Sequence, residues 1–308
     1  MMPTGDLLGV LAALGSGLAW ALGSILFRRI GERASPAAMN LTKSVMGLGV
    51  LGIGVVATGV SAIQPGQILP LALSGVLGIA VGDTLFFAAL VRLEPRVTLL
   101  LATVGNVMTV LLAALVLGER PTVLAWAGIA LVIGAVGWVL QLGAETEESG
   151  AGPVRSARQI GILCGVGAAF ATSSSLLIAK VAIEGVVGQP EMSVLQATWI
   201  RLFAGVVALG MFRAVQGELA GDLAAFKLPG FVKELLVAVT VVMYGGFWLS
   251  LLSLRYTDAA VATALAGTEP ILVLPLLHFW LGERVRPAAW IAALVGVIGV
   301  GMIVWATG

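Results

Sequence analysis

The chain has 308 residues, of which 59% are hydrophobic and only 11% are charged. A soluble domain of this length needs far more charge on its surface, so the composition indicates an integral membrane protein. The net charge of +1 gives no excess of basic residues of the kind that binds nucleic acid. Because Cys164 is the single cysteine and His278 the single histidine, we expect no internal disulfide and no metal site. No cofactor is expected either.

Ten apolar stretches follow one another along the chain, with short loops between them. Each is close to the roughly 20 residues that a helix needs to cross a bilayer. The predicted helices cover residues 7–27, 38–60, 68–90, 97–117, 123–142, 160–180, 195–213, 234–254, 260–281 and 287–306. The sequence therefore predicts an all-α integral membrane protein with ten transmembrane helices.

Lysine and arginine are distributed unevenly between the two sets of loops. Twelve of them lie in the connections that follow the odd-numbered helices: Arg28, Arg29, Arg33, Arg92, Arg96, Arg155, Arg158, Arg213, Lys227, Lys233, Arg284 and Arg286. The opposite face has three: Arg120, Lys180 and Arg255. Because basic loops stay on the cytoplasmic side, this bias predicts a cytoplasmic segment 144–159 and two external termini.

The chain repeats itself on either side of a polar segment, residues 144–159. Gly118-Glu119-Arg120 aligns with Gly282-Glu283-Arg284, and in both copies a tryptophan follows at the same distance. We therefore divide the chain into a first repeat (1–143), a linker (144–159) and a second repeat (160–308). Each repeat contains five predicted helices, and since five is odd, the second repeat enters the membrane with the opposite polarity.

Inverted repeats are typical of secondary transporters, whose substrate binds near the membrane midplane between the two halves. A duplicated, purely structural bundle is the alternative. We interpret the Gly-Glu-Arg elements as turns at the water interface, in which Gly118 and Gly282 end a helix and Thr122 or Pro287 starts the next one.

Three motifs carry a resemblance to a known family. They are Thr268-Glu269-Pro270 through Leu281-Gly282-Glu283-Arg284, the counterpart Leu117-Gly118-Glu119-Arg120, and Gly82-Asp83-Thr84-Leu85-Phe86-Phe87. With them the chain resembles, over essentially its whole length, the EamA-type members of the drug/metabolite transporter superfamily. The resemblance implies ten helices in two inverted five-helix repeats, and transport of small metabolites, often by exchange or proton coupling. It also implies internal termini, whereas the charge bias predicts external ones.

Four ionisable residues lie inside the predicted membrane helices: Lys43, Asp83, Arg201 and Glu269. A charge at this depth costs a few kcal/mol, so each is expected to face a partner or a wet cavity. Depth in the membrane predicts that Lys43 can meet Asp83 and makes a second pair, of Arg201 with Glu269, plausible. These residues are either structural ion pairs or groups that line a cavity and bind substrate or a proton.

Glu269 is the stronger functional candidate because Pro270 and Pro275 follow it in the same predicted helix. Proline leaves backbone carbonyls without partners, which a cavity can satisfy. Apolar surroundings favour the neutral form of a carboxyl group, which suits reversible protonation during transport. Asn106, at the position equivalent to Pro270 in the first repeat, is either a polar contact from the other half or a packing amide.

Several aromatic residues complete the predicted substrate-binding set: Trp20, Phe86, Trp199, Tyr244 and Trp248. They are candidates for the walls of an aromatic cavity. Ser173, Ser174 and Ser175 either line a path or, as we favour, serve close helix packing.

These patterns predict a secondary transporter, in particular an exporter, in the inner cell membrane. Its partners are expected to be the lipid bilayer, a small polar or amphipathic metabolite of amino-acid-like character, and protons if transport is proton-coupled rather than an exchange. Nucleic acid is not expected as a partner. The alternatives are an intramembrane enzyme, whose common motifs the sequence lacks, and a channel or non-transporting scaffold.

Overall fold

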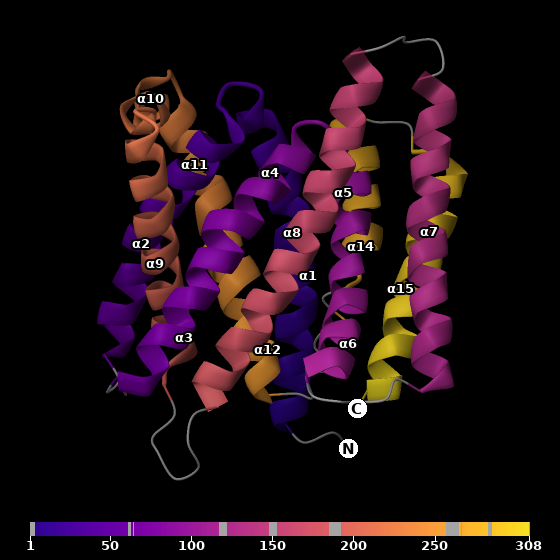
Figure 1. Cartoon of the computed structure of the whole chain (residues 1–308), viewed down its shortest axis with the longest axis horizontal. Coiled ribbons are helices and arrows are strands. Elements are labelled where there is room, and N and C mark those ends of the chain that lie inside the picture. Colours follow the sequence, from indigo (N-terminus) through magenta and orange to yellow (C-terminus); the bar gives the residue numbers. More distant parts are fainter. Residues whose placement is uncertain are drawn as a thin grey trace.

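The computed structural model describes residues 4–60, 63, 65–116, 122–147, 153–184, 192–256, 265, 267–282 and 285–307. In these residues the regular secondary structure is helical (Figure 1). The helices stand side by side, and both labelled ends of the chain lie at the lower end of Figure 1. Gly118 and the Glu-Arg pairs of both predicted turns lie outside the described residues.

The first half of the chain forms α1 (Thr4–Gly31), α2 (Pro36–Thr58), α3 (Pro65–Gly75), the π-helix η1 (Val76–Asp83), α4 (Thr84–Leu90), α5 (Pro95–Ala102), α6 (Val104–Val116) and α7 (Val123–Glu147). The second half forms α8 (Pro153–Glu184), α9 (Val194–Val215), α10 (Leu219–Leu223), the 3-10 helix η2 (Ala224–Lys227), α11 (Phe231–Thr240), the π-helix η3 (Val241–Trp248), α12 (Leu249–Tyr256), α14 (Glu269–Pro275), the π-helix η4 (Leu276–Trp280) and α15 (Pro287–Thr307).

The described residues contain six helical spans that are long and apolar enough to cross a membrane. They are Leu7–Gly31, Pro36–Thr58, Gly66–Leu90, Ser156–Ala179, Val194–Val215 and Phe231–Ser253. Three shorter apolar helices cover Val123–Val139, Glu269–Trp280 and Pro287–Ile303. The chain is thus a multi-pass, all-helical membrane protein, and the number of ten crossings stays a prediction.

Local sequence signals explain where several helices begin and end. The side chain of Ser35 caps α2 by accepting a hydrogen bond from the Ala38 amide at 3.1 Å, and Pro36 fits the first helical position because its amide would have no partner there. Gly282 follows η4 with a φ of +67°, a conformation that glycine adopts without a steric penalty. The predicted helix end at Gly282 and the predicted start at Pro287 are therefore confirmed.

Four predicted helices are less regular than the hydrophobic pattern suggested. The predicted spans 68–90 and 234–254 contain the π-helices η1 and η3. The predicted span 97–117 breaks at Thr103. In the predicted span 260–281 a turn at 267–268 precedes α14, which begins at Glu269. When the two halves are aligned on their Gly-Glu-Arg elements, residue 103 falls on residue 267, and η1 falls within one residue of η3. The helix break and the π-helix therefore occur at corresponding places in both halves.

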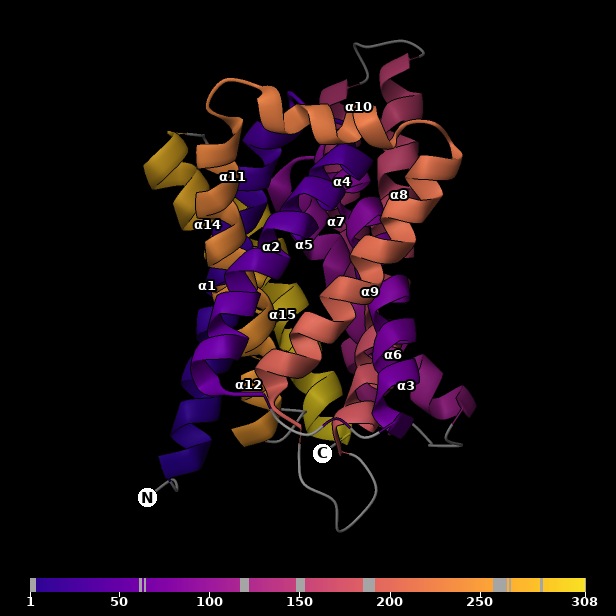
Figure 2. The same ribbon diagram turned by 90° about the vertical axis from the view of Figure 1, so that its left-hand side faces the viewer.

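The connection between α9 and α11 also differs from the expected loop, because it contains the short helices α10 and η2. Arg213 at the end of α9 holds this connection through hydrogen bonds to Asp222, the shorter at 2.5 Å. A charge pair of this kind ties α10 to the end of a membrane helix. Figure 2 shows α10 crossing the upper end of the molecule.

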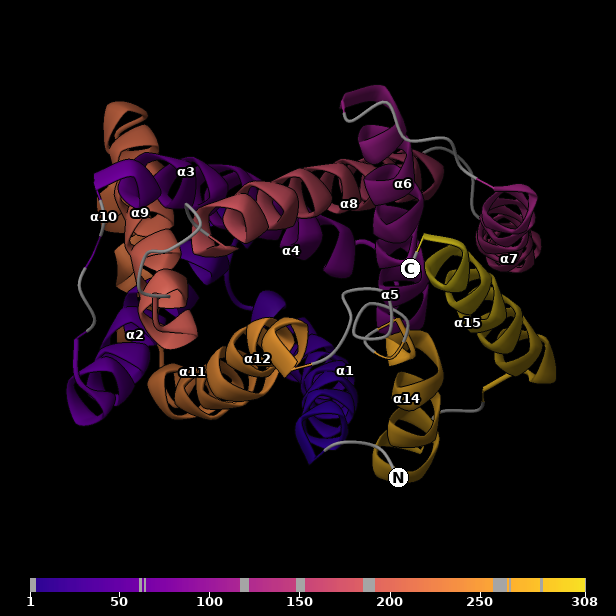
Figure 3. The ribbon, with the colours of Figure 1, turned by 90° about the horizontal axis from the view of Figure 1, so that it is seen from below.

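The two halves pack against each other in a reciprocal pattern. The first helix of the first half, α1, contacts η3 and α12, whereas the first helix of the second half, α8, contacts η1 and α4. Likewise α2 packs on α9, and α7 on α15, as the view from below shows (Figure 3). In Figure 1, α1 begins at the lower end and α8 at the upper end. An inverted repeat gives this arrangement, which underlies the division into two halves that we use below.

The orientation predicted from charge can be checked with single cysteines in a Cys164→Ser background. We expect a membrane-impermeant thiol reagent on intact cells to label Thr307→Cys, at the end of α15, because the basic loops hold the opposite face in the cytoplasm. It should leave Ser149→Cys, in the linker, unlabelled until the cells are permeabilised. The reverse pattern would contradict the charge-based orientation and support internal termini.

Candidate functional site

A buried ion pair joins α2 to the end of η1. The ammonium group of Lys43 contacts the carboxylate of Asp83, so the predicted contact between them is confirmed. Lys43 is only 1% exposed, and Asp83 is partly buried. In the membrane each charge would be costly alone, which explains why the two occupy one site.

A second buried cation, Arg201, lies on α9 and is 3% exposed. Its Nη2 atom donates a hydrogen bond to the Ser175 hydroxyl of α8 at 3.0 Å. Ser175 in turn donates to the Ser74 carbonyl at 2.7 Å, and Ser74 donates to the Ser175 carbonyl at 2.7 Å. This serine pair links α3 of the first half to α8 of the second, so Ser175 serves close packing and also presents a polar group to Arg201.

Lys43 and Arg201 occupy equivalent places in the two halves. Each follows the first residue of its helix by seven positions, Pro36 in α2 and Val194 in α9. In both helices a buried glycine and a buried leucine follow at the same spacing, namely Gly47 and Leu51 in α2, and Gly205 and Leu209 in α9. The repeat therefore places one cation from each half in corresponding buried positions.

An aromatic cluster, formed by Trp20, Phe86, Phe87 and Phe247, lies beside the head of Lys43. The Lys43 Nζ atom lies 5.3 Å from the centroid of the Phe87 ring and 5.5 Å from that of Phe247. Trp20 packs edge-on against Phe247 at 5.0 Å and against Phe86 at 6.3 Å. A ring face attracts a cation, so this cluster stabilises the charge of Lys43 beyond its pairing with Asp83.

The other predicted aromatic residues lie along α2 and do not belong to this cluster. Trp199 donates its indole N–H to the Leu48 carbonyl at 3.0 Å, and Tyr244 donates its hydroxyl to the Val50 carbonyl at 2.6 Å. Trp248 packs edge-on against Tyr244. A Cβ on Gly54 would lie 3.0 Å from the Tyr244 hydroxyl, so this glycine permits the close approach. All five predicted aromatic residues nevertheless pack against the same hydrophobic core.

The π-helices η1 and η3 present backbone carbonyls to side chains of neighbouring helices. A π-helix shifts the hydrogen-bond pattern and is frequent at functional sites. Asn40 of α2 donates to the Ile79 carbonyl in η1 at 2.7 Å, and Ser16 of α1 donates to the Gly246 carbonyl in η3 at 3.0 Å. Ser173 of α8 similarly donates to the Gly105 carbonyl at 2.8 Å, just after the break at Thr103 between α5 and α6. A polar group from another helix thereby holds η1, η3 and the start of α6.

Glu269 lies apart from the buried cations. It is the first residue of α14 and is partly buried, whereas Arg201 belongs to α9. Figure 3 shows α9 and α14 on opposite sides of the molecule. The predicted pair of Arg201 and Glu269 is therefore wrong, because depth in the membrane places two residues on one level but not on neighbouring helices. Asn106, partly buried on α6, lies in the equivalent helix of the first half.

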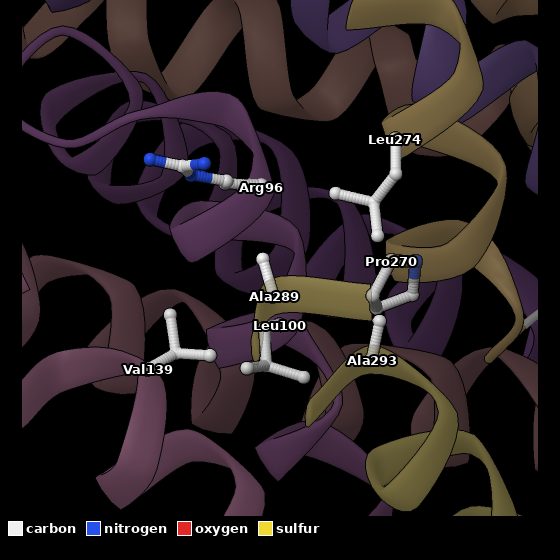
Figure 4. Close-up of a pocket in the computed structure, with 7 residues that line it drawn as sticks. All are labelled: Arg96, Leu100, Val139, Pro270, Leu274, Ala289 and Ala293. Atoms are coloured by element: carbon white, nitrogen blue, oxygen red, sulfur yellow. The ribbon is translucent and has the colours of Figure 1, made fainter. Parts of the chain in front are cut away.

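A small pocket lies beside Pro270, the residue that follows Glu269, between α5, α7, α14 and α15 (Figure 4). Its room is on the scale of a single water molecule, too little for a metabolite. The lining residues are Arg96, Leu100, Val139, Pro270, Leu274, Ala289 and Ala293. The guanidinium of Arg96 pairs with Glu94 and points away from the other lining residues, so the lining is apolar. This end of α14 is therefore a separate location from the Lys43–Asp83 pair.

Sequence reasoning missed some residues that shape the site. Asn40 lies three positions before Lys43, and its amide inside an apolar helix was an available signal. Ser74, Gly78 and Phe247 offered no such signal, because small and aromatic residues are common in membrane helices. Their roles depend on which helices become neighbours.

The helices and the buried charges between the two halves define a polytopic membrane protein with a polar centre. A family model described as the EamA-like transporter family matches residues 7–141 and again residues 159–305. The chain therefore belongs to the EamA-like transporter family, whose members generally transport small substrates.

Comparison with solved structures supports the same fold. One crystal structure matches with a TM-score of 0.64 over 98% of this chain and 96% of that chain, at 18% sequence identity. At this identity the likeness shows the fold alone. No curated protein matches the chain.

Proposed function

We propose that this protein is a secondary transporter that exports a small polar or amphipathic metabolite across the inner cell membrane by alternating access. The observation that carries the proposal is the set of charged groups buried where the two halves meet. Lys43 and Asp83 belong to the first half, and Arg201 with Ser175 belongs to the second. A rocking motion of the halves would expose these groups to one side of the membrane and then to the other.

The irregular helices support this mechanism. A regular apolar helix satisfies its own backbone, whereas η1, η3 and the breaks before α6 and α14 leave polar backbone groups near the contact between the halves. In this proposal the aromatic cluster and the Lys43–Asp83 pair form one wall of the substrate site. Trp199, Tyr244, Trp248 and Asn106 belong to the surrounding helices, and Glu269 is the proton-exchanging group.

Counterflow in liposomes tests the proposal. Metabolites are first screened by the thermal stability of the purified protein, since a bound ligand raises its melting temperature. Liposomes that contain the protein and an unlabelled hit compound are then diluted into the labelled compound. We expect saturable accumulation of label that disappears in protein-free liposomes.

Flux that rises linearly with concentration would indicate a channel and contradict the carrier mechanism. Chemical conversion of the labelled compound without accumulation would indicate the enzyme alternative instead. Each outcome is read from the same liposomes by separating the internal label chromatographically.

A further inference from the structure

The buried site contains two cations and, in the part of the chain that the structure describes, one acid that acts on both. Lys43 contacts Asp83 directly. Arg201 is attracted by Asp83 through space, but its hydrogen bond goes to Ser175. Its Nε atom is buried without a hydrogen-bond partner among the described residues. Two positive charges and one negative charge leave a net charge of +1 at this site.

A buried positive charge that lacks a counter-charge is unfavourable in a low-dielectric environment. An anionic group beside Arg201 would neutralise the site and provide an acceptor for the guanidinium. Lys43 is the weaker binding partner for such an anionic group, because its ammonium already contacts Asp83 and two aromatic rings. The unmatched charge therefore belongs to Arg201.

A glycine brings the backbone of η1 close to Ser175 beside the guanidinium group. A Cβ on Gly78 of η1 would lie 3.7 Å from Arg201 Nη2 and would overlap the Ser175 hydroxyl. Any side chain at position 78 would thus push η1 away from Ser175, so the two segments pack tightly beside Arg201. A ligand group could therefore enter here only after η1 of the first half and α8 of the second half separate.

We propose that Arg201, together with Ser175, binds a carboxylate group of the transported substrate, so that the protein carries carboxylate-bearing metabolites. Guanidinium groups bind carboxylates through charge-assisted hydrogen bonds that match the planar geometry of both partners. The proposal rests on the proposed transport function: Arg201 is enclosed in this conformation, and a substrate reaches it when α9 and α8 of the second half separate from η1 of the first.

The first test needs no ligand and compares two substitutions. Arg201→Met removes the unmatched charge, and Ser175 keeps its hydrogen bonds with Ser74, so we expect the melting temperature in carboxylate-free buffer to stay equal or rise. Lys43→Met leaves Asp83 unpaired and should lower it. If Arg201→Met lowers the melting temperature as much as Lys43→Met does, Arg201 is a structural residue and the proposal fails.

The second test uses matched probes that differ in the carboxylate: leucine against leucinamide, and benzoate against benzamide, at constant ionic strength. At least one carboxylate, near ten times its dissociation constant, should raise the melting temperature by about 2–4 °C, and its amide should not. Arg201→Met should abolish this rise, whereas Arg213→Met, the same change on the same helix but outside the site, should retain it. No rise with either carboxylate, or an equal rise in the Arg201→Met protein, overturns the proposal.

Counterflow separates this proposal from the transport function on which it rests. If the wild-type protein accumulates a labelled compound and Arg201→Met accumulates it equally, the transporter stands and the carboxylate site falls. If a carboxylate binds in an Arg201-dependent manner but no compound is accumulated, the carboxylate site stands and the transport function falls.

Discussion

Replacing Lys43 with methionine is expected to reduce the stability of the folded protein by roughly 3–5 kcal/mol, because the change leaves the Asp83 carboxylate buried without its partner. Asp83→Leu should have a similar effect, since it leaves the ammonium of Lys43 unpaired. The double substitution should be milder than the sum, because it removes both charges together. Melting temperatures of the wild type, the two single variants and the double variant, measured in one detergent, give the energetic coupling between Lys43 and Asp83.

An exposed ion pair provides the matched control for this double-mutant cycle of Lys43 and Asp83. Arg33, in the connection between α1 and α2, contacts Glu234 of α11, but their side chains are 37% and 52% exposed. Water solvates each partner when the other is removed, so Arg33→Met and Glu234→Leu should each cost at most about 1 kcal/mol. Strictly additive losses in the Lys43–Asp83 cycle would contradict energetic coupling between the two residues.

Glu269→Gln is expected to abolish the pH dependence of net transport while the protein still folds and inserts. Glutamine keeps the size and hydrogen-bonding capacity of the side chain but cannot exchange a proton. Glu269 begins α14, directly before Pro270, at a helix start that interrupts an apolar stretch. Such discontinuous helices are where transporters place coupling groups. The measurement is uptake into liposomes over a range of pH, with and without an imposed pH gradient.

Glu234→Gln serves as the control, because Glu234 lies in the first turn of α11, is exposed and pairs with Arg33. It should transport with the pH profile of the wild type. Exchange of substrate for substrate is expected to survive in Glu269→Gln if the carboxyl group serves the proton alone. An unchanged pH profile would assign Glu269 a different role, such as stabilising the positive end of α14.

The sequence by itself determined the membrane class, the approximate positions of the apolar helices and the buried charges. The bilayer makes these features predictable, because it demands long apolar segments and makes each intramembrane charge conspicuous. The contact of Lys43 with Asp83 was also predictable, since their helices are consecutive in the chain and the two residues lie at similar depth.

Only the tertiary structure decided which distant helices meet, and this is where the prediction of an Arg201–Glu269 pair was wrong. Depth along the membrane normal is encoded locally, but position within the membrane plane depends on helix packing. The π-helices η1 and η3 were equally invisible, because a shift in backbone hydrogen bonding leaves the hydrophobic pattern unchanged. Arg201 beside Gly78 and Ser175 is a product of that packing: three helices from two halves place these residues together, and no spacing in the sequence records it.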